Sequence, residues 1–482
     1  MSTWHPAYRE GVLAADYRFA AEHLLHHFVD AMTAHLDTVL RMPAYSAPEV
    51  QAQGAELRRA LVALHEEPVP EQAADVPDLY FALQRKLEAA HGDAVGLIRV
   101  GLSRNDLDMT VYKMSGRAYL LATGKRLLRL RELLLEKAET HLETVVIAET
   151  HHQPGQPTTA AHYLGAVEDQ LTRDSDRLQA AYDRMNYSPL GAAALAGSSH
   201  PLDREFTARR LGFRAPVANT YDAVSSADWE FDLVSVAQSV ALGLGRLVTD
   251  MLAWAASGRY RLDDELVQGS SIMPQKRNPV SLEHTRTKLS RVVGAASMFY
   301  FSSHNIPFTD LNDFGPDMQG ALASQHRQLS GALDLLTACL AGGEFDKRKL
   351  AELAAATDTT ATELADVLAR EHGLSFPAAH GVAARLVKQM FEQGRPLTTA
   401  GPADIEAAGG PRLTAEEATA ALDPAAFVRR RAGLGMPAPE VMTTQLARAR
   451  ERLDADTAAL RERESALDRA TAQLRGSERE FA

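Results

Sequence analysis

The sequence predicts an all-α protein with long helices at its centre. Three segments, 114–146, 162–185 and 231–254, carry apolar residues at steps of three and four, the period of an amphipathic helix. Segment 231–254 is nearly all apolar, which is typical of a helix buried within a bundle or between subunits. Stretches of strand-like alternation are scarce. The fold class expected is therefore all-α, with a long-helix bundle.

The length of 482 residues exceeds what one hydrophobic core usually serves, so more than one lobe is expected. We predict an N-terminal helical domain (1–103), a central long-helix bundle (104–345), and a small C-terminal helical domain with a tail helix (346–482). The tail from Val441 onward alternates charges at helical spacing, which indicates a solvated or partner helix. Stretches rich in polar residues, Gly and Pro predict breaks between helices at 186–201, 268–279 and 304–317.

Composition excludes several classes of protein. The net charge of −12 and the absence of a long basic run argue against nucleic acid as a partner. Cys339 is the only cysteine, so an intramolecular disulfide and a Cys-rich zinc site are excluded. We see no secretory pattern and no uncharged apolar run of 18 residues, and we expect a cytoplasmic protein without a membrane partner. Neither a metal nor an organic cofactor is expected.

Polar clusters interrupt the apolar periodicity. "LSRND" (102–106) could bind a carboxylate through the guanidinium of its arginine, or could simply cap a helix. "ETHHQPGQPTT" (149–159) contains His151, whose ordinary pKa suits acid–base work, although the same letters also describe a surface turn. In 186–201, the glycines could let the backbone approach a ligand, or could serve helix contacts.

The richest cluster is "QGSSIMPQKRNP", residues 268–279. Lys276 and Asn278 supply a charge and an amide, and Ser270 could act as a nucleophile or, if ionised by nearby cations and amides, as a base. No His–Asp partner is evident beside it, so a hydrolase triad is not indicated. Glu283, five residues after Asn278, could orient a histidine that lies opposite.

Taken in order, these clusters resemble the fumarase/aspartase superfamily, and most closely argininosuccinate lyases. The matching stretches are "SRND", "TH-Q--QPTT", "SPLGAAALAG", "DAVSSAD", "GSSIMPQKRNP" and "TELADVLA", and the likeness covers roughly residues 95–435. The resemblance implies a three-lobed protomer whose long helices form a twenty-helix core in a homotetramer, with each active site built from three subunits. It also implies a small dicarboxylate substrate and a β-elimination that usually releases fumarate.

The resemblance carries catalytic roles to particular residues. Ser270 would take the Cβ proton, with Ser271 as the alternative base. Lys276 would stabilise the aci-carboxylate intermediate, and His151, held by Glu283, would be the acid or its electrostatic support.

Other positions are implied to hold the substrate. Asn278 would help to stabilise the intermediate, and Gln153 would line the pocket. Substrate carboxylates would be held by Ser103, Arg104, Asn105 and Thr150.

Several positions depart from argininosuccinate lyases. Leu102 stands where they carry Arg in "HTGRSRND", and Ala227 where they carry Arg in "DAVSDRD". In "TDLNDFGPDM" (309–318), Asp310 replaces the Tyr of "AYNKDLQEDK", and Gly315 and Met318 replace its Gln and Lys. A carboxylate in place of an anion-binding tyrosine favours a leaving group that is cationic or differently shaped.

We therefore expect a carbon–nitrogen lyase that cleaves an N-substituted aspartate into fumarate and an amine, reversibly. Ethylenediamine-disuccinate-type lyases are one model for such a substrate. The alternatives are argininosuccinate lyase itself, a nitrosuccinate-type elimination, a carboxymuconate-type cycloisomerase, and a structural tetramer with decayed chemistry.

Overall fold

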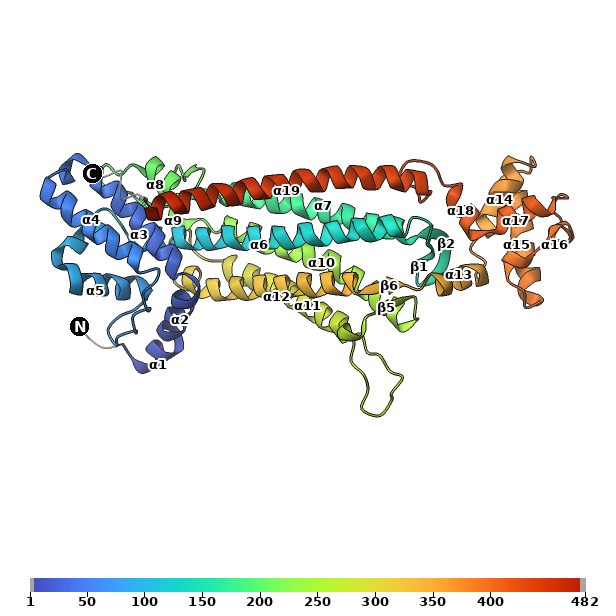
Figure 1. Cartoon of the computed structure of the whole chain (residues 1–482), viewed down its shortest axis with the longest axis horizontal. Coiled ribbons are helices and arrows are strands. Elements are labelled where there is room, and N and C mark those ends of the chain that lie inside the picture. Colours follow the sequence, from blue (N-terminus) through green and yellow to red (C-terminus); the bar gives the residue numbers. More distant parts are fainter. Residues whose placement is uncertain (1–3, 477–482) are drawn as a thin grey trace.

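The structure, a computed structural model, describes residues 4–476. Figure 1 shows an elongated molecule in which long helices lie side by side, with helical lobes at both ends. These helices are α6 (Arg104–Thr140), α7 (Ala160–Met185), α10 (Asp228–Ala256), α11 (Val280–Ser303), α12 (Gly315–Ala341) and α19 (Pro439–Gly476). The predicted all-α class and the three predicted long helices are confirmed.

The N-terminal lobe packs against the beginning of α6. Its α-helices are α1 (Pro6–Tyr8), α2 (Ala14–His23), α3 (Leu25–Leu40), α4 (Pro48–Ala63) and α5 (Leu79–His91). A π-helical turn covers Arg9–Leu13, and 3-10 turns cover Pro43–Tyr45 and Gly92–Arg99. One apolar core joins this lobe to the adjacent half of the bundle, because Leu36 and Leu83 belong to the same buried cluster as Leu107 and Leu121. The lobe therefore holds the first turn of α6 in a fixed place.

Short elements connect the long helices. Residues 186–201 and 268–279 contain no helix, as predicted, whereas α12 begins at Gly315, inside the break predicted at 304–317. The strands pair as β1 (Val145–Thr150) with β2 (Gln153–Thr159), β3 (Tyr187–Ser188) with β4 (Ala215–Pro216), and β5 (Tyr260–Leu262) with β6 (Gly343–Phe345). Only the β3–β4 pair is parallel. The remaining connectors are α8 (Arg204–Arg210), α9 (Thr220–Ser225) and a 3-10 turn at Asp264–Leu266.

The C-terminal lobe has its own core. It comprises α13 (Lys347–Ala356), α14 (Ala361–Arg370), α15 (Phe376–Glu392), α16 (Pro402–Ala407), α17 (Ala415–Leu422), α18 (Pro424–Arg429) and a 3-10 turn at Leu397–Thr399. Its buried apolar residues run from Leu364 to Leu422 and form a cluster separate from the bundle.

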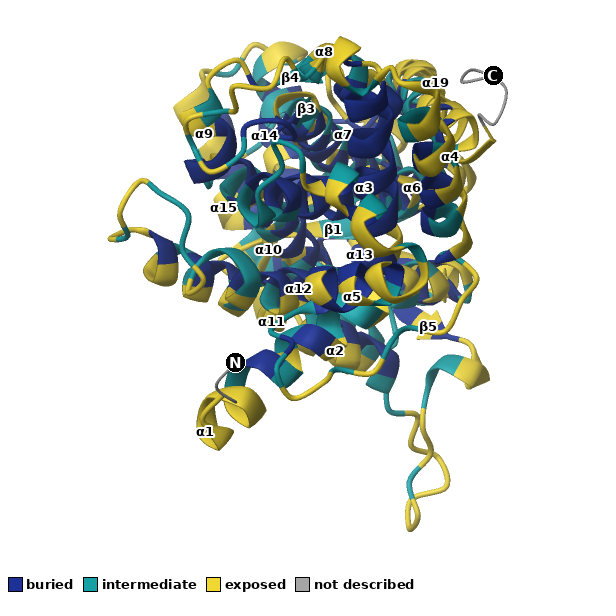
Figure 2. Ribbon diagram, turned by 90° about the vertical axis from the view of Figure 1, so that its left-hand side faces the viewer, coloured by how far each residue is buried: buried dark blue, intermediate teal, exposed yellow. Residues whose placement is uncertain are grey.

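The tail helix α19 differs from its prediction as part of a C-terminal unit. It runs back along α6 and α7 and ends beside the N-terminal lobe (Figure 1). Leu446 and Leu453 are buried in the bundle core, and Leu460 and Leu474 in the core shared with the N-terminal lobe. The helix is thus a structural part of the bundle, although its outer face is solvated as its charge pattern predicted. Figure 2 shows the buried interior of the bundle beneath exposed outer faces.

Helix α10 is long and apolar enough to cross a membrane by length and composition, and half of its most apolar window is buried inside the bundle. A core helix of a bundle passes the same test. Its contacts with α7 and α11 account for the apolar character.

Candidate active site

The first turn of α6 carries Ser103 and Asn105 and is held by a capping box. The backbone N–H of Ser103 donates to Asp106 Oδ1 at 2.9 Å, and the Ser103 hydroxyl accepts from the backbone N–H of Asn105 at 3.3 Å. Asp106 also accepts from the backbone N–H of Gly191 at 2.8 Å, which ties the 186–201 loop to the same turn. Helix capping, one of the two interpretations of "SRND", is therefore confirmed for Ser103.

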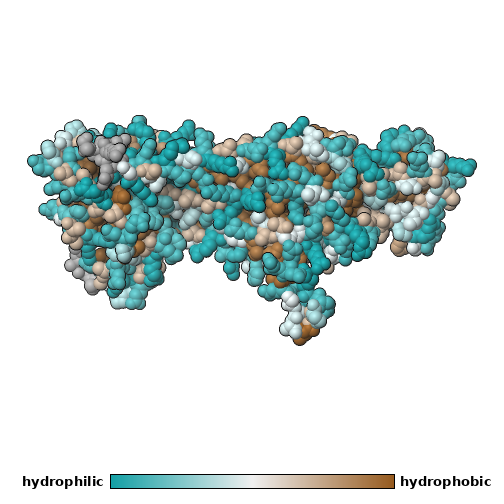
Figure 3. Space-filling model, in the orientation of Figure 1, coloured by the Kyte–Doolittle hydropathy of each residue, from teal (hydrophilic) through white to brown (hydrophobic). Residues whose placement is uncertain are grey.

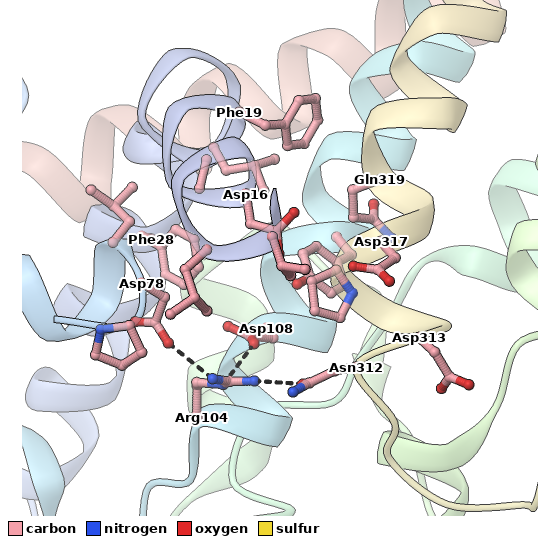
Figure 4. A pocket seen from close by; sticks show the side chains of 18 of the residues that line it. Asp16, Phe19, Phe28, Asp78, Arg104, Asp108, Asn312, Asp313, Asp317 and Gln319 are labelled. Carbon is pink, nitrogen blue, oxygen red and sulfur yellow. Dashed lines mark hydrogen bonds and ion pairs between the residues drawn. The ribbon is translucent and has the colours of Figure 1, made fainter. Parts of the chain in front are cut away.

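Arg104 lies in a dense polar cluster (Figure 4). Its Nη1 donates to Asp78 Oδ2 and its Nη2 to Asn312 Oδ1, both at 2.9 Å, while its Nε lies 3.3 Å from Asp108 Oδ2. Burial raises the pKa of Asp108 well above its ordinary value, against the lowering effect of the Arg104 charge. Burial also raises the pKa of Asp310, and Arg104 again opposes the shift. The positive charge of Arg104 thus stabilises the ionised forms of several carboxylates.

A cavity of about 610 Å³ opens beside Arg104, between the N-terminal helices and the start of α12; we call it the N-terminal cavity. That volume falls within the range of sites for small organic ligands. Its wall combines aromatic side chains, such as Phe19 and Phe28, with carboxylates such as Asp16 and Asp317 (Figure 4).

The β1–β2 hairpin presents Thr150, His151 and Gln153 at its tip. His151 and His152 adopt positive φ angles of 55° and 59°, which lets the chain reverse between Thr150 and its pairing partner Gln153. All of these side chains are exposed, and Gln153 Nε2 donates to the His152 carbonyl at 3.0 Å. An ion pair of 2.7 Å between Arg259 and Glu149 fastens the hairpin to the bundle. The side chain of His151 is therefore available to a ligand.

Residues 268–279, which we call the Ser270 loop, extend away from the bundle (Figure 1). Gln268 and Asn278 exchange two backbone hydrogen bonds, of 3.0 and 2.8 Å, which close the base of the loop. The Ser270 hydroxyl accepts from the backbone N–H groups of Ile272 at 3.3 Å and Met273 at 3.2 Å. Ser271 and Lys276 are exposed to solvent and Ser270 is half-buried, on a loop whose base is held by hydrogen bonds.

Arg277 binds residues near the base of this loop. It forms an ion pair with Asp264, and its Nη2 donates to the Leu262 carbonyl at 2.6 Å. Neighbouring cations in the sequence therefore have different positions: Arg277 holds the base, and Lys276 points outward.

The predicted site residues fall into two groups at opposite ends of the bundle. The first group lies beside the N-terminal lobe and consists of Ser103, Arg104, Asn105 and Asp310. The second group lies on the hairpin, on the Ser270 loop and at the start of α11, and consists of Thr150, His151, Gln153, Ser270, Ser271, Lys276, Asn278 and Glu283. Helix α6 has 37 residues and lies between Ser103 and the hairpin, so it separates them by about 55 Å at 1.5 Å per residue. Within the described part of the chain, His151 and Glu283 make no hydrogen bond or ion pair with each other. The two groups do not meet within one protomer.

Sequence reasoning missed the carboxylates around Arg104. Asp108 stands four residues after Arg104 on the same helix, a spacing that brings side chains together and could have predicted the ion pair. Asp16 and Asp317 come from α2 and α12, and no local pattern connects them with Arg104. Among residues 4–476, no group of three or more His, Cys, Asp or Glu is placed to hold a metal ion.

The all-α fold and these motifs indicate a lyase of the fumarase/aspartase type, and comparisons with known proteins agree. The family model described as "Lyase" matches residues 78–294, and that described as "Argininosuccinate lyase C-terminal" matches 358–429. Argininosuccinate lyase of Methanoculleus marisnigri is 35% identical, with 98% of this chain and 99% of that protein covered. Argininosuccinate lyase 2 of Agrobacterium fabrum is 33% identical over 93% of this chain and 91% of that protein.

Solved structures agree with these relatives. EDDS lyase in complex with formate has a TM-score of 0.87 and 28% identity, covering all of this chain and 96% of that one. An EDDS lyase variant with bound fumarate gives the same values. The chain therefore belongs to the fumarase/aspartase superfamily, close to argininosuccinate lyase, and is a carbon–nitrogen lyase.

Proposed function

We propose that the protein cleaves the C–N bond of an N-substituted aspartate by anti β-elimination, releasing fumarate and an amine, and catalyses the reverse addition. The Ser270 loop carries this proposal, because it presents a hydroxyl, an ammonium and an amide on an exposed segment with a pinned base. The likeness to argininosuccinate lyase and EDDS lyase supports carbon–nitrogen cleavage as the reaction class.

In the proposed reaction Ser270 removes the proton from Cβ, with Ser271 as the alternative base. Removal of this weakly acidic proton leaves two negative charges on one carboxyl unit of the intermediate. Lys276 and the Asn278 amide lie on the same loop and stabilise that dianion, which lowers the barrier most where water is excluded. Closure of the exposed loop over the substrate would provide that exclusion.

The carboxylates of the substrate are held by the other residues of the proposal. Ser103, Asn105, Thr150 and Gln153 supply neutral donors. Arg104 can bind a carboxylate by exchanging the neutral, exposed Asn312 amide at its Nη2 for the anion, a stronger acceptor.

The proposed active site is shared between protomers of a homotetramer. The separation of the two groups along α6 supports this proposal, in which other chains bring the hairpin and the Ser270 loop to the N-terminal end. Figure 3 shows apolar patches over the bundle, and Leu242 on α10 and Met298 and Phe301 on α11 are large exposed apolar side chains. Such side chains suit helix packing between subunits. In this assembly His151 of one chain would meet Glu283 of another.

Argininosuccinate is the second candidate substrate, favoured by the names of the relatives. Asp310 argues against it as the main substrate. A carboxylate at this position, partly neutralised by Arg104, disfavours an additional substrate anion.

The test is to mix the protein with fumarate and a panel of amines and follow the loss of fumarate absorbance, and then to assay the N-substituted aspartates in the cleavage direction. Ser270→Ala should lower kcat by at least about a hundredfold, the usual contribution of a proton-transferring group. Ser290→Ala, an exposed serine on α11, is the matched control and should keep full activity. If no amine adds to fumarate and no N-substituted aspartate is cleaved, the proposal is wrong. Full activity in Ser270→Ala would transfer the role of base to Ser271.

A further inference from the structure

The N-terminal cavity has an excess of negative charge. Five carboxylates and one guanidinium line its described wall. Arg104 is paired with Asp78 and Asp108. The other three, Asp16, Asp313 and Asp317, form no ion pair with a described residue. The charge of the cavity is therefore compensated on the Arg104 side only.

Asp16 and Asp317 interact unfavourably with each other. Burial raises the pKa of Asp16, and the negative charge of Asp317 raises it further, while Arg104 lowers it. The half-buried Asp16 carboxyl faces the like charge of the exposed Asp317, an arrangement that favours a cation between them because a cation relieves the repulsion.

Independent of these charges, two largely buried side chains in the wall each keep one oxygen without a hydrogen-bond partner among the described residues. Tyr112 is 5% exposed, and its hydroxyl makes no hydrogen bond with a described residue. Gln319 is 4% exposed; its Nε2 donates to Glu230 Oε1 at 2.9 Å and to the Gly315 carbonyl at 3.1 Å, which leaves its Oε1 without a donor. Both residues line the cavity, where each oxygen can accept a hydrogen bond from a ligand that carries N–H donors.

The remaining wall is apolar. Phe19, Phe28 and Leu24 line the inner part, and Trp4 and Tyr8 stand at a half-open edge, their rings 5.8 Å apart. A chain of methylene groups can pack on these side chains, and an aromatic face attracts an ammonium group. The wall therefore suits a ligand with an alkyl body and a positively charged end.

We infer that the N-terminal cavity binds the positively charged far end of the amine leaving group, through Asp16, Asp317, Tyr112 and Gln319. This rests on the proposed function and specifies its substrate class: N-(ω-aminoalkyl)aspartates, which yield fumarate and an α,ω-diamine. Arg104 borders the cavity and belongs to the group that holds the substrate, so the amine end faces the acidic wall.

The elimination balances for such a substrate. The Cβ–H electron pair becomes the second bond of the fumarate double bond, and the proton goes to the base. The C–N electron pair leaves with nitrogen, which takes up a proton to give the free amine. The distal ammonium group keeps its proton and its charge throughout, so the cavity binds it equally in substrate and product.

Three amines of similar length test the inference in the addition direction. They are 1,4-diaminobutane, pentylamine, in which a methyl replaces the second amine, and 4-aminobutanoate, which carries an anion instead. We expect kcat/KM to be about tenfold higher for 1,4-diaminobutane than for pentylamine, as for a hydrogen-bonded charged group. Addition of 4-aminobutanoate should be the slowest. Equal rates for all three would overturn the inference and leave the proposed function standing.

Charge-removing variants locate the effect. Asp16→Asn and Asp317→Asn should each lower the preference for 1,4-diaminobutane over pentylamine several-fold. Asp93→Asn, an exposed carboxylate of the same lobe outside the cavity, should leave the preference unchanged. Retention of the full preference in the Asp16→Asn/Asp317→Asn double variant, folded by its far-ultraviolet circular dichroism, would contradict the inference.

Direct binding separates this inference from the proposed function. Calorimetric titration of the wild-type protein with 1,4-diaminobutane, without fumarate, should give a binding heat that the double variant loses. If no amine reacts but this binding is seen, the reaction is wrong and the cation site is right. If neither reaction nor binding occurs, both are wrong.

Discussion

Arg131 and Asp456 lie 2.7 Å apart, Nη1 to Oδ2, in the interior of the bundle, although one is on α6 and the other on the tail helix α19. Arg131 is completely buried, and its Nε also pairs with Glu168 Oε1 of α7 at 2.8 Å. Ser175 Oγ also accepts from Nη1, and Thr172 Oγ1 accepts from Nη2. One guanidinium therefore joins three helices through a hydrogen-bonded network.

Replacement of Arg131 by Met should destabilise the protein strongly. It leaves Glu168 buried without its cation and Asp456 paired with the exposed Arg452, and removal of one partner from a buried pair costs ~3–5 kcal/mol. We expect a large drop in the thermal denaturation midpoint. Arg129→Met is the control, since Arg129 is exposed and pairs only with Glu132, and it should change the stability by less than ~1 kcal/mol. Similar midpoints for the two variants would contradict the structural role of Arg131.

His35 should make the stability depend on pH. It is buried against the Val100 carbonyl, with Nε2 2.9 Å away, and burial lowers its pKa from 6.5 to about 4. The unfolded chain therefore binds a proton at His35 below pH 6.5, while the folded chain does not until about pH 4. The contribution to stability is complete above pH 6.5 and is lost as the pH falls towards 4, by ~3 kcal/mol in total.

The variant His35→Gln isolates this effect, because the amide can still donate to Val100 while it cannot titrate. Denaturation midpoints measured from pH 7.5 to 4.5 should fall more steeply for the wild type than for the variant. Parallel curves would show that His35 does not titrate in this way. His27 and His326, whose pKa values burial also lowers to about 4, contribute equally to both curves.

Ala193 is a site where glycine should stabilise the protein. Its φ is +50°, in the left-handed region that disfavours a Cβ atom by ~1 kcal/mol. Ala193→Gly removes that cost, and the greater freedom of glycine in the unfolded chain offsets part of the gain. We expect a net increase of ~0.5 kcal/mol in the free energy of unfolding. Ala194→Gly, at a neighbouring position without a positive φ, should instead lower it. The opposite order of the two variants would contradict the backbone geometry.

Much of the fold could be predicted from local periodicity. The three- and four-residue apolar steps located α7 and α10 to within three residues at each end, whereas α6 begins ten residues before its predicted segment and ends six residues before the segment does. Gly- and Pro-rich stretches located breaks between helices. The packing of α19 was missed because its charges obscured a seven-residue repeat of leucines, Leu446, Leu453, Leu460, Leu467 and Leu474. Those leucines form the stripe that packs on α6 and α7, as expected for apolar residues at heptad spacing.

The candidate site also has parts that could be predicted from local sequence and a part that could not. The Ser270 loop and the hairpin tip are local segments, so their exposure and turns could be predicted from their own residues. The acidic cavity could not, because Asp16 and Asp317 meet only when α2 and α12 pack against the start of α6. The spacing of residues in a single sequence does not reveal that two side chains so far apart in the chain lie close together.

The last prediction concerns the separation of the two groups of site residues. If each active site combines the N-terminal end of one chain with the hairpin and Ser270 loop of others, then Ser270→Ala and Asn105→Ala inactivate different parts of it. Each variant alone lacks activity at every site. A tetramer that contains both variants has some sites in which every contributing chain supplies its unaltered residue. Co-expression of the two variants should therefore restore part of the wild-type activity, measured as fumarate release.

As a control, co-expression of Ser270→Ala with Lys276→Met should restore none, because both changes lie on the same loop and every site receives one of them. Activity no higher than that of the single variants in the first mixture would mean that each site is completed within one chain, which the ~55 Å length of α6 opposes.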